Sequence, residues 1–109
     1  MRILFIDDIR NPFDYIDNVD GVYVVIVRNS HDALEALKEF TFDIVFFDHD
    51  LGEDRTGYDI AKWIVENNIN IKQGFKIVSS NPVGRFNISQ LLNRYGYQEI
   101  SWNFKKFII

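Results

Sequence analysis

The amino-acid sequence predicts an α/β fold, a doubly wound parallel sheet of five strands with the last helix short or absent. Short runs that are apolar at every position recur along the chain, as in strands that are covered on both faces. Stretches with apolar residues at helical spacing separate these runs, and such alternation is typical of right-handed parallel β-α-β units. With 109 residues, the chain has room for one hydrophobic core, so residues 1–109 are predicted to form a single domain.

The expected strands are rich in β-branched and aromatic residues, which favour extended backbone. They cover residues 3–6, 22–27, 43–47 and 75–78, with a weaker fifth strand around residues 98–102. For five strands of this kind the leading arrangement is the flavodoxin-like order 2-1-3-4-5, with helices on both faces of the sheet.

Three segments carry the expected helices. The first begins at Ser30, a good N-terminal cap, and the others cover residues 60–65 and 83–95. A weaker, short helix is expected over residues 11–18, because a proline suits the first helical turn. The chain ends in FKKFII, which is too short for an ordinary last helix. A truncated helix, an extra edge strand and a contact surface remain open for it.

Composition narrows the class of function. The chain has no cysteine, which excludes disulfides, zinc-thiolate sites and cysteine nucleophiles. Its net charge of −4 disfavours extended binding to DNA backbones. The apolar run at the N-terminus is too short for a signal peptide, and no stretch approaches the ~20 apolar residues that span a membrane. We therefore expect a cytoplasmic protein with no membrane association.

Polar side chains follow three of the predicted strands at the point where each strand ends. In a parallel sheet of this order these ends meet near the switch point where ligands bind. The residues are Asp7 and Asp8 after the first strand, Asp48, His49 and Asp50 after the third, and Ser79, Ser80 and Asn81 after the fourth. Carboxylates packed together repel one another, and Mg²⁺ or another divalent cation relieves this repulsion. Alternatively, the aspartates simply end strands and begin turns.

Together these residues resemble a receiver domain of the response-regulator superfamily. There, an acidic pair after the first strand binds Mg²⁺, an aspartate after the third accepts a phosphoryl group, a serine or threonine follows the fourth, and a lysine follows the fifth. The matching positions here are Asp7 and Asp8, Asp48, and Ser79 or Ser80. The lysine has no clear counterpart, since residues 101–103 read Ser-Trp-Asn and Lys105 is a loose substitute. This departs from the pattern of phosphorelay signalling.

A closer resemblance is to a receiver subfamily that processes cyclic phosphates and occurs, among other places, in phages and RNA-repair contexts. Its sequence blocks correspond to DDIRNP at residues 7–12, DHDLG and TGYD within residues 48–59, and SSNPVGR at residues 79–85. One position departs from the pattern, because the subfamily has a histidine just before the serine and this chain has Val78. If that histidine is catalytic, this protein has lost it or relies on His49.

The resemblance and the chemistry of the side chains imply a role for each residue. The predicted metal ligands are Asp7, Asp8 and Asp48, and the predicted catalytic residues are Asp48, His49 and Asp50. Asp48 is a metal ligand or a carboxylate nucleophile, and Asp50 is a further ligand or a general base. Histidine is a common proton donor in catalysis, so His49 either protonates a leaving ribose oxygen or points away and braces the loop.

A second group of residues is predicted to contact phosphate. The members are Ser79, Ser80, Asn81, Arg10 and Arg85. Either arginine clamps a phosphate through two N–H groups or forms a surface salt bridge. The Asn81-Pro82 step begins a helix, and the free backbone N–H groups of a helix start attract an anion.

The predicted function is hydrolysis of a cyclic phosphate on a nucleotide or RNA end, dependent on Mg²⁺ or another divalent cation, by a single receiver-like domain over residues 1–109. The alternative is a receiver-type signalling or interaction module, non-catalytic or phosphorylated on Asp48, that binds a protein partner. The expected partners are accordingly a phosphate-containing small molecule, an RNA end or a protein.

Overall fold

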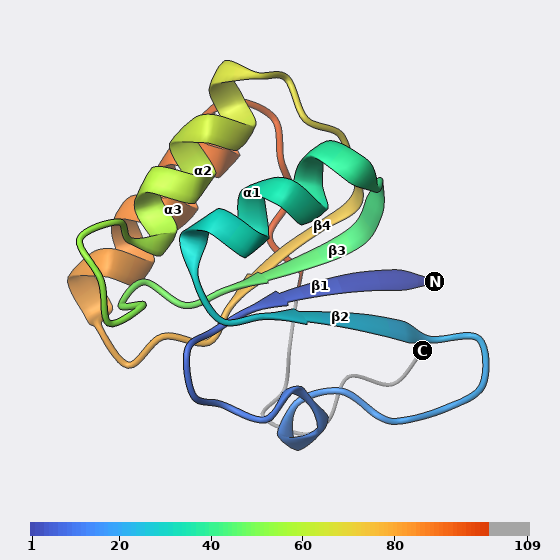
Figure 1. The fold of residues 1–109 in the computed structure, drawn as a ribbon. Coiled ribbons are helices and arrows are strands. Elements are labelled where there is room, and N and C mark those ends of the chain that lie inside the picture. The colour runs from blue at the N-terminus through green and yellow to red at the C-terminus, as the bar shows by residue number, and fades with distance from the viewer. Residues whose placement is uncertain (101–109) are drawn as a thin grey trace.

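The computed structural model of the chain describes residues 1–100 (Figure 1). Four parallel strands form one sheet in the order β2-β1-β3-β4. They are β1 (Arg2–Ile6), β2 (Tyr23–Val27), β3 (Phe42–Phe47) and β4 (Ile71–Ile77). This order confirms the flavodoxin-like arrangement for the first four strands.

Three α-helices are described, α1 (Ser30–Glu39), α2 (Gly57–Glu66) and α3 (Pro82–Arg94). Each begins after a side chain that accepts a hydrogen bond from a backbone N–H of the first turn. These caps are Asn29, Thr56 and Asn81. The expected cap of the first helix was wrong by one residue, because Ser30 is already helical and Asn29 accepts from the backbone N–H of Asp32.

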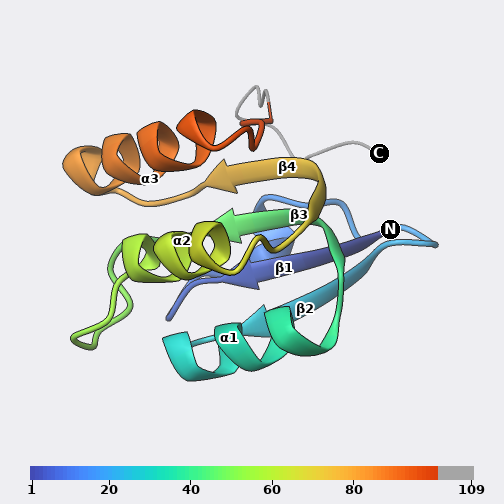
Figure 2. The same cartoon turned by 90° about the horizontal axis from the view of Figure 1, so that it is seen from above.

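All three α-helices lie on the same face of the sheet (Figure 2). Their buried side chains share one core cluster with strand residues such as Leu4, Val45 and Phe47. The opposite face forms a second cluster around Phe5 and Phe46, to which no residue of the three helices belongs. Within residues 1–100, the expectation of helices on both faces is therefore not met.

The segment between β1 and β2 explains this one-sided arrangement. The helix expected over residues 11–18 is reduced to the 3-10 turn η1 (Pro12–Asp14). Ile16 follows that turn and is fully buried in the second cluster. Residues 17–21 are polar or glycine apart from Val19, so they offer no apolar stripe on which a longer helix would pack.

A fifth strand is not confirmed. Glu99 forms a single parallel bridge with Phe75. In it the backbone N–H of Phe75 donates to Gln98 O (2.9 Å), and the N–H of Ile100 donates to Phe75 O (2.8 Å). The chain thus reaches the edge of the sheet beside β4 where the fifth strand was expected. Residues 101–102 of that strand and the FKKFII segment lie outside the described residues.

The strands supply the largest fully buried side chains. These include Phe5, Phe42, Phe46, Phe47 and Phe75. Burying one such side chain contributes roughly 1.5–3 kcal/mol to the free energy of unfolding. The sheet is therefore a stable base for the residues that follow its strands. Among the described helices, none is long and apolar enough to cross a membrane.

Candidate functional site

The carboxyl ends of β1, β3 and β4 lie together at one end of the sheet, beside the starts of α2 and α3 (Figures 1 and 2). The hydrogen bonds of the sheet continue one residue past the strands. The backbone N–H of Asp7 donates to Val27 O (3.1 Å), and that of Asp48 donates to Ile6 O (2.9 Å). The backbone of the sheet therefore holds these two aspartates next to each other.

The side chains of Asp7, Asp8 and Asp48 form a carboxylate cluster. Each offers an oxygen atom, and these atoms lie within 4.8 Å of one another. Asp7 is 0% exposed and Asp48 is 4% exposed, whereas Asp8 is half-buried. Three carboxylates at this spacing fit a hard divalent cation, which prefers oxygen ligands and offsets their repulsion. The structure thus brings together the three residues predicted as metal ligands.

Arg10 provides a positive charge inside this cluster. Its Nη1 lies 3.0 Å from Asp7 Oδ2 and 3.2 Å from Asp48 Oδ2. Its Nη2 donates to Ser80 Oγ at 3.3 Å. Of the two roles expected for Arg10, the structure contains the ion pair, although the partners are buried carboxylates and not surface groups. Arg10 also links residues that follow β1, β3 and β4.

The environment of Asp48 raises its pKa from the ordinary 3.8 to about 6. Burial is the largest cause, since it disfavours the charged form, and the negative charge of Asp7 acts in the same direction. The guanidinium of Arg10 and a hydrogen bond from Ser79 lower the pKa without cancelling the rise. The ionised form of Asp48 is therefore disfavoured, and a cation bound beside the carboxylate would offset this effect.

The backbone around Asp7 is fixed by two sets of hydrogen bonds. Asp7 Oδ1 accepts from the backbone N–H groups of Ile9 (3.0 Å) and Arg10 (2.9 Å). Arg28 Nη1 donates to the carbonyl oxygens of Asp7 (3.2 Å) and Arg10 (2.6 Å). Arg28 was not anticipated from the sequence. It directly follows β2, so the rule that selected residues at strand ends would have found it if applied to the second strand.

Ser79 and Asn81 organise the segment between β4 and α3. Ser79 is buried, and its Oγ accepts from the backbone N–H of Asn81 at 3.1 Å. Asn81 Oδ1 accepts from the backbone N–H of Gly84 at 3.0 Å, as a helix cap. Ser80 is exposed beside Arg10. The residues predicted to contact phosphate after β4 thus lie at the start of α3, next to the carboxylate cluster.

His49 and Asp50 lie beside Asn81. His49 Nδ1 is 3.1 Å from Asp50 Oδ1 and 3.4 Å from Asn81 Nδ2. The histidine ring packs so closely on α3 that a Cβ at position 84 would collide with it, which requires glycine there. This packing matches the bracing role that was weighed for His49. Neither residue belongs to the carboxylate cluster, and their catalytic roles stay predictions.

Arg85 is exposed on the first turn of α3. Within residues 1–100 its side chain has no ion pair or hydrogen bond. It is therefore the one predicted phosphate contact that the structure does not tie to the rest of the site.

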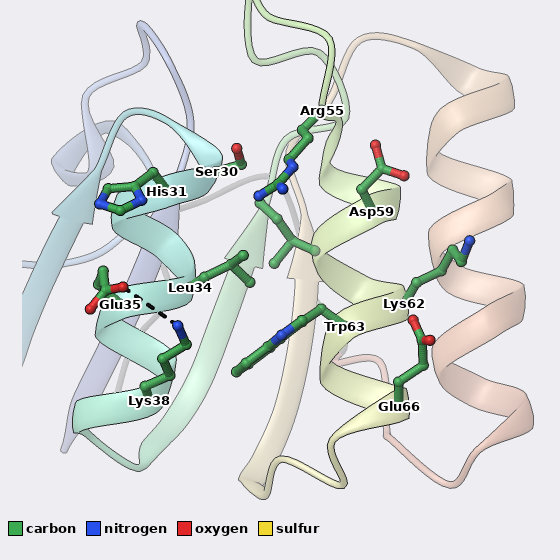
Figure 3. A pocket seen from close by; sticks show the side chains of 11 residues that line it. Ser30, His31, Leu34, Glu35, Lys38, Arg55, Asp59, Lys62, Trp63 and Glu66 are labelled. Atoms are coloured by element: carbon green, nitrogen blue, oxygen red, sulfur yellow. Dashed lines mark hydrogen bonds and ion pairs between the residues drawn. The ribbon is translucent and has the colours of Figure 1, made fainter.

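A separate groove lies between α1 and α2 (Figure 3). Its volume is about 520 Å³, and Leu34, Ile60 and Trp63 supply its apolar lining. Charged side chains of both signs surround them, including the pair of Lys38 and Glu35 at 3.5 Å. No residue predicted for the site lines this groove, so it is distinct from the carboxylate cluster.

A family model described as the cyclic-phosphate processing receiver domain matches residues 2–94. The chain belongs to this family. The match covers all residues predicted for the site, from Asp7 to Arg85. No curated protein matches the chain.

Solved structures of other receiver domains share the fold. The signal receiver domain of a protein described as a Luxo repressor, from Vibrio parahaemolyticus, is 19% identical, with a TM-score of 0.66 over 90% of this chain and 74% of that chain. A response regulator from Burkholderia pseudomallei is 16% identical, with a TM-score of 0.63 over 90% and 56%. A CheY-like receiver domain from Methanospirillum hungatei JF-1 is 17% identical, with a TM-score of 0.59 over 90% and 77%. At these identities the likeness shows the fold alone.

Proposed function

We propose that this receiver domain is a cytoplasmic enzyme that hydrolyses a cyclic phosphate, on a nucleotide or at an RNA end, with a divalent cation such as Mg²⁺. The observation that carries the proposal is the position of the carboxylate cluster beside the start of α3, in a member of the cyclic-phosphate processing family. A group that binds cations and a group that binds anions thus lie at neighbouring strand ends, as a metal–phosphate site requires.

In this proposal Asp7, Asp8 and Asp48 hold the cation, which would offset negative charge on the phosphate oxygens. Ser80 and the positive N-terminal end of the α3 dipole attract those oxygens, and Arg10 lies beside Ser80 to bind them as well. Arg85 on the exposed first turn of α3 is the second candidate cation for the phosphate.

The reaction adds one water molecule across a phosphorus–oxygen bond. Water, or Asp48 in a first covalent step, attacks phosphorus in line with the leaving ribose oxygen, and the bond to that oxygen breaks. The leaving oxygen takes a proton, for which His49 is the candidate donor, and the attacking water gives up a proton, for which Asp50 beside His49 is the candidate base. If Asp48 attacks, phosphorus stays bonded to the second ribose oxygen, and water then cleaves the bond between Asp48 and phosphorus and restores the carboxylate. The product is a phosphomonoester.

Turnover of a 2′,3′-cyclic nucleotide, followed by phosphorus NMR, tests this function directly. We expect conversion to a phosphomonoester in the presence of Mg²⁺, and loss of conversion with a chelator or in Asp48→Ala. Asp20→Asn, which changes an exposed aspartate in the loop before β2, is the matched control and should retain activity. Absence of turnover with Mg²⁺, Mn²⁺ and Ca²⁺ alike would show that the hydrolytic proposal is wrong.

A second candidate is a phosphorylated signalling or interaction module that binds a protein partner. The structure from Burkholderia pseudomallei carries a phosphorylated aspartic acid and a calcium ion. In the present chain Asp48 follows β3 and has Arg10 and Ser79 as neighbours, which are groups able to stabilise a phosphoryl group. A mass gain of one phosphoryl group after incubation with a small phosphodonor and Mg²⁺, absent in Asp48→Asn, would support this candidate. An unchanged mass would exclude phosphorylation by that donor.

A further inference from the structure

One nitrogen atom of Arg10 bridges two carboxylates of the cluster. Nη1 lies 3.0 Å from Asp7 Oδ2 and 3.2 Å from Asp48 Oδ2. The contact with Asp7 is a charge-assisted hydrogen bond, which is stronger than a hydrogen bond between neutral groups, and the contact with Asp48 is an ion pair. Both carboxylates are nearly or fully excluded from solvent, so water screens the interaction weakly. Arg10 therefore acts in the structure as the counter-ion that holds these two acids together.

We propose that Arg10 is an internal competitor for the divalent cation, and that a bound phosphate relieves the competition. This inference rests on the proposed metal–phosphate site and concerns its regulation. A cation coordinated by Asp7 and Asp48 would bind carboxylate groups that are already paired with Arg10 Nη1. The free energy of that pairing therefore lowers the affinity of the site for the cation. Phosphate gives the guanidinium another anionic partner. Metal and phosphate then bind cooperatively, each raising the affinity of the other by the same factor.

The surroundings of Arg10 allow the side chain to change partners while its backbone stays in place. The backbone is held at both ends, because its N–H donates to Asp7 Oδ1 and its carbonyl oxygen accepts from Arg28. The side chain is 23% exposed, so a phosphate has access to it. Nη2 already faces Ser80 Oγ at 3.3 Å, beside the start of α3. The exchange thus requires rotation of one side chain and no movement of the loop.

Calorimetric titration with Mg²⁺, with and without inorganic phosphate, tests the proposal on three proteins. They are the wild type, Arg10→Gln and Arg94→Gln. The last is a control with the same charge change at the exposed end of α3. Without phosphate, we expect Arg10→Gln to bind Mg²⁺ roughly tenfold more tightly than the wild type, within the usual range of coupling. Phosphate should raise the Mg²⁺ affinity of the wild type several-fold and have little effect in Arg10→Gln. Arg94→Gln should behave as the wild type.

Failure of this inference is distinguishable from failure of the proposed site. If Arg10→Gln binds Mg²⁺ equally or more weakly, or if phosphate coupling is the same in both proteins, the competition does not exist although the metal site does. If neither protein binds Mg²⁺, the metal site and the competition are both excluded.

The wild type provides a second measurement that does not depend on the folding of a variant. The NMR signal of the Arg10 Nη1–H group reports the ion pair directly, because Nη1 makes both carboxylate contacts. We expect it to shift on saturation with Mg²⁺ and to shift again when inorganic phosphate is added. A signal that is unchanged at saturating Mg²⁺ would overturn the proposal.

Discussion

Burial and a neighbouring negative charge disfavour the ionised form of Asp48, which is the form that would bind a cation. The pKa of Asp48 is raised to about 6, first by burial and then by the neighbouring Asp7. Because the folded pKa lies above the ordinary value of 3.8, this group stabilises the fold fully at low pH, where it is protonated in both states. That stability is lost as the pH rises through the folded pKa. Ionised Asp48 thus destabilises the chain near neutrality unless a cation binds.

The variant Asp48→Asn should therefore be more stable than the wild type at about pH 7.5 in a chelator, by about 3 kcal/mol, which is the shift of the Asp48 pKa expressed as free energy. This advantage should shrink as the pH falls from about 7 to about 4, because the wild-type carboxyl becomes protonated in the folded state. Thermal unfolding of both proteins across this range measures the difference. A gap that stays constant or widens on acidification would contradict the raised pKa.

Arg28 acts on the site through the backbone. It donates to the carbonyl oxygens of Asp7 and Arg10 and so fixes the loop that carries both side chains. We expect Arg28→Gln to weaken Mg²⁺ binding roughly tenfold, as loss of an outer partner does in other metal sites. Calorimetric titration of Arg28→Gln with Mg²⁺, with Arg94→Gln as the control, measures this change in affinity. Unchanged affinity in Arg28→Gln would show that the loop does not need this support.

At the scale of single elements, the start of α3 depends on the contact between Gly84 and His49. A Cβ at position 84 would collide with the ring of His49. Overpacking of this kind costs about 1–3 kcal/mol, whereas alanine is favoured over glycine in a helix by about 1 kcal/mol. The sign of Gly84→Ala therefore depends on whether the histidine is present.

We expect Gly84→Ala to destabilise the wild type and to stabilise His49→Ala. Denaturant unfolding of the four proteins in this double-mutant cycle gives the coupling between the two positions. Additive effects would mean that the ring moves aside at no cost, and the bracing role of His49 would then be wrong.

Most elements were predictable because their apolar patterns are strong. The expected strand over residues 75–78 nevertheless covers only the second half of β4 (Ile71–Ile77) and runs one residue past its end. In the first half Lys72 and Gln73 are exposed, and Gly74 has a φ of 148°. The first half of β4 therefore lacks the apolar run by which buried strands are recognised in a sequence. It contains two exposed polar residues and a glycine in an unusual conformation.

The acidic residues of the site followed from one rule, that side chains after parallel strands meet at one end of the sheet. That rule brought Asp7, Asp8 and Asp48 together correctly. It did not reveal that Arg10 bridges two of them, because this depends on the turn formed by Asp7 Oδ1 and the N–H groups of Ile9 and Arg10. A hydrogen-bonded turn of this kind leaves no periodic signal in the sequence.

At the scale of the whole molecule, the carboxylate cluster joins the two central strands of the described sheet. Asp7 follows β1 and Asp48 follows β3, and these strands contain much of the buried core. A cation bound to both aspartates binds the folded chain and not the unfolded one, since the two are far apart in sequence. Binding must therefore raise the stability of the whole domain by mass action.

With about 10 mM Mg²⁺ and a dissociation constant of about 1 mM, the gain is about 1.4 kcal/mol, which corresponds to a rise in melting temperature of about 6 °C. Asp7→Asn should abolish this rise. The asparagine oxygen can still accept the backbone hydrogen bonds of Ile9 and Arg10, so the variant should fold. Asp20→Asn, which removes an exposed carboxylate, should keep the full rise. If neither Mg²⁺, Mn²⁺ nor Ca²⁺ raises the melting temperature of the wild type, the cluster is not a metal site and the aspartates serve only to end strands and begin turns.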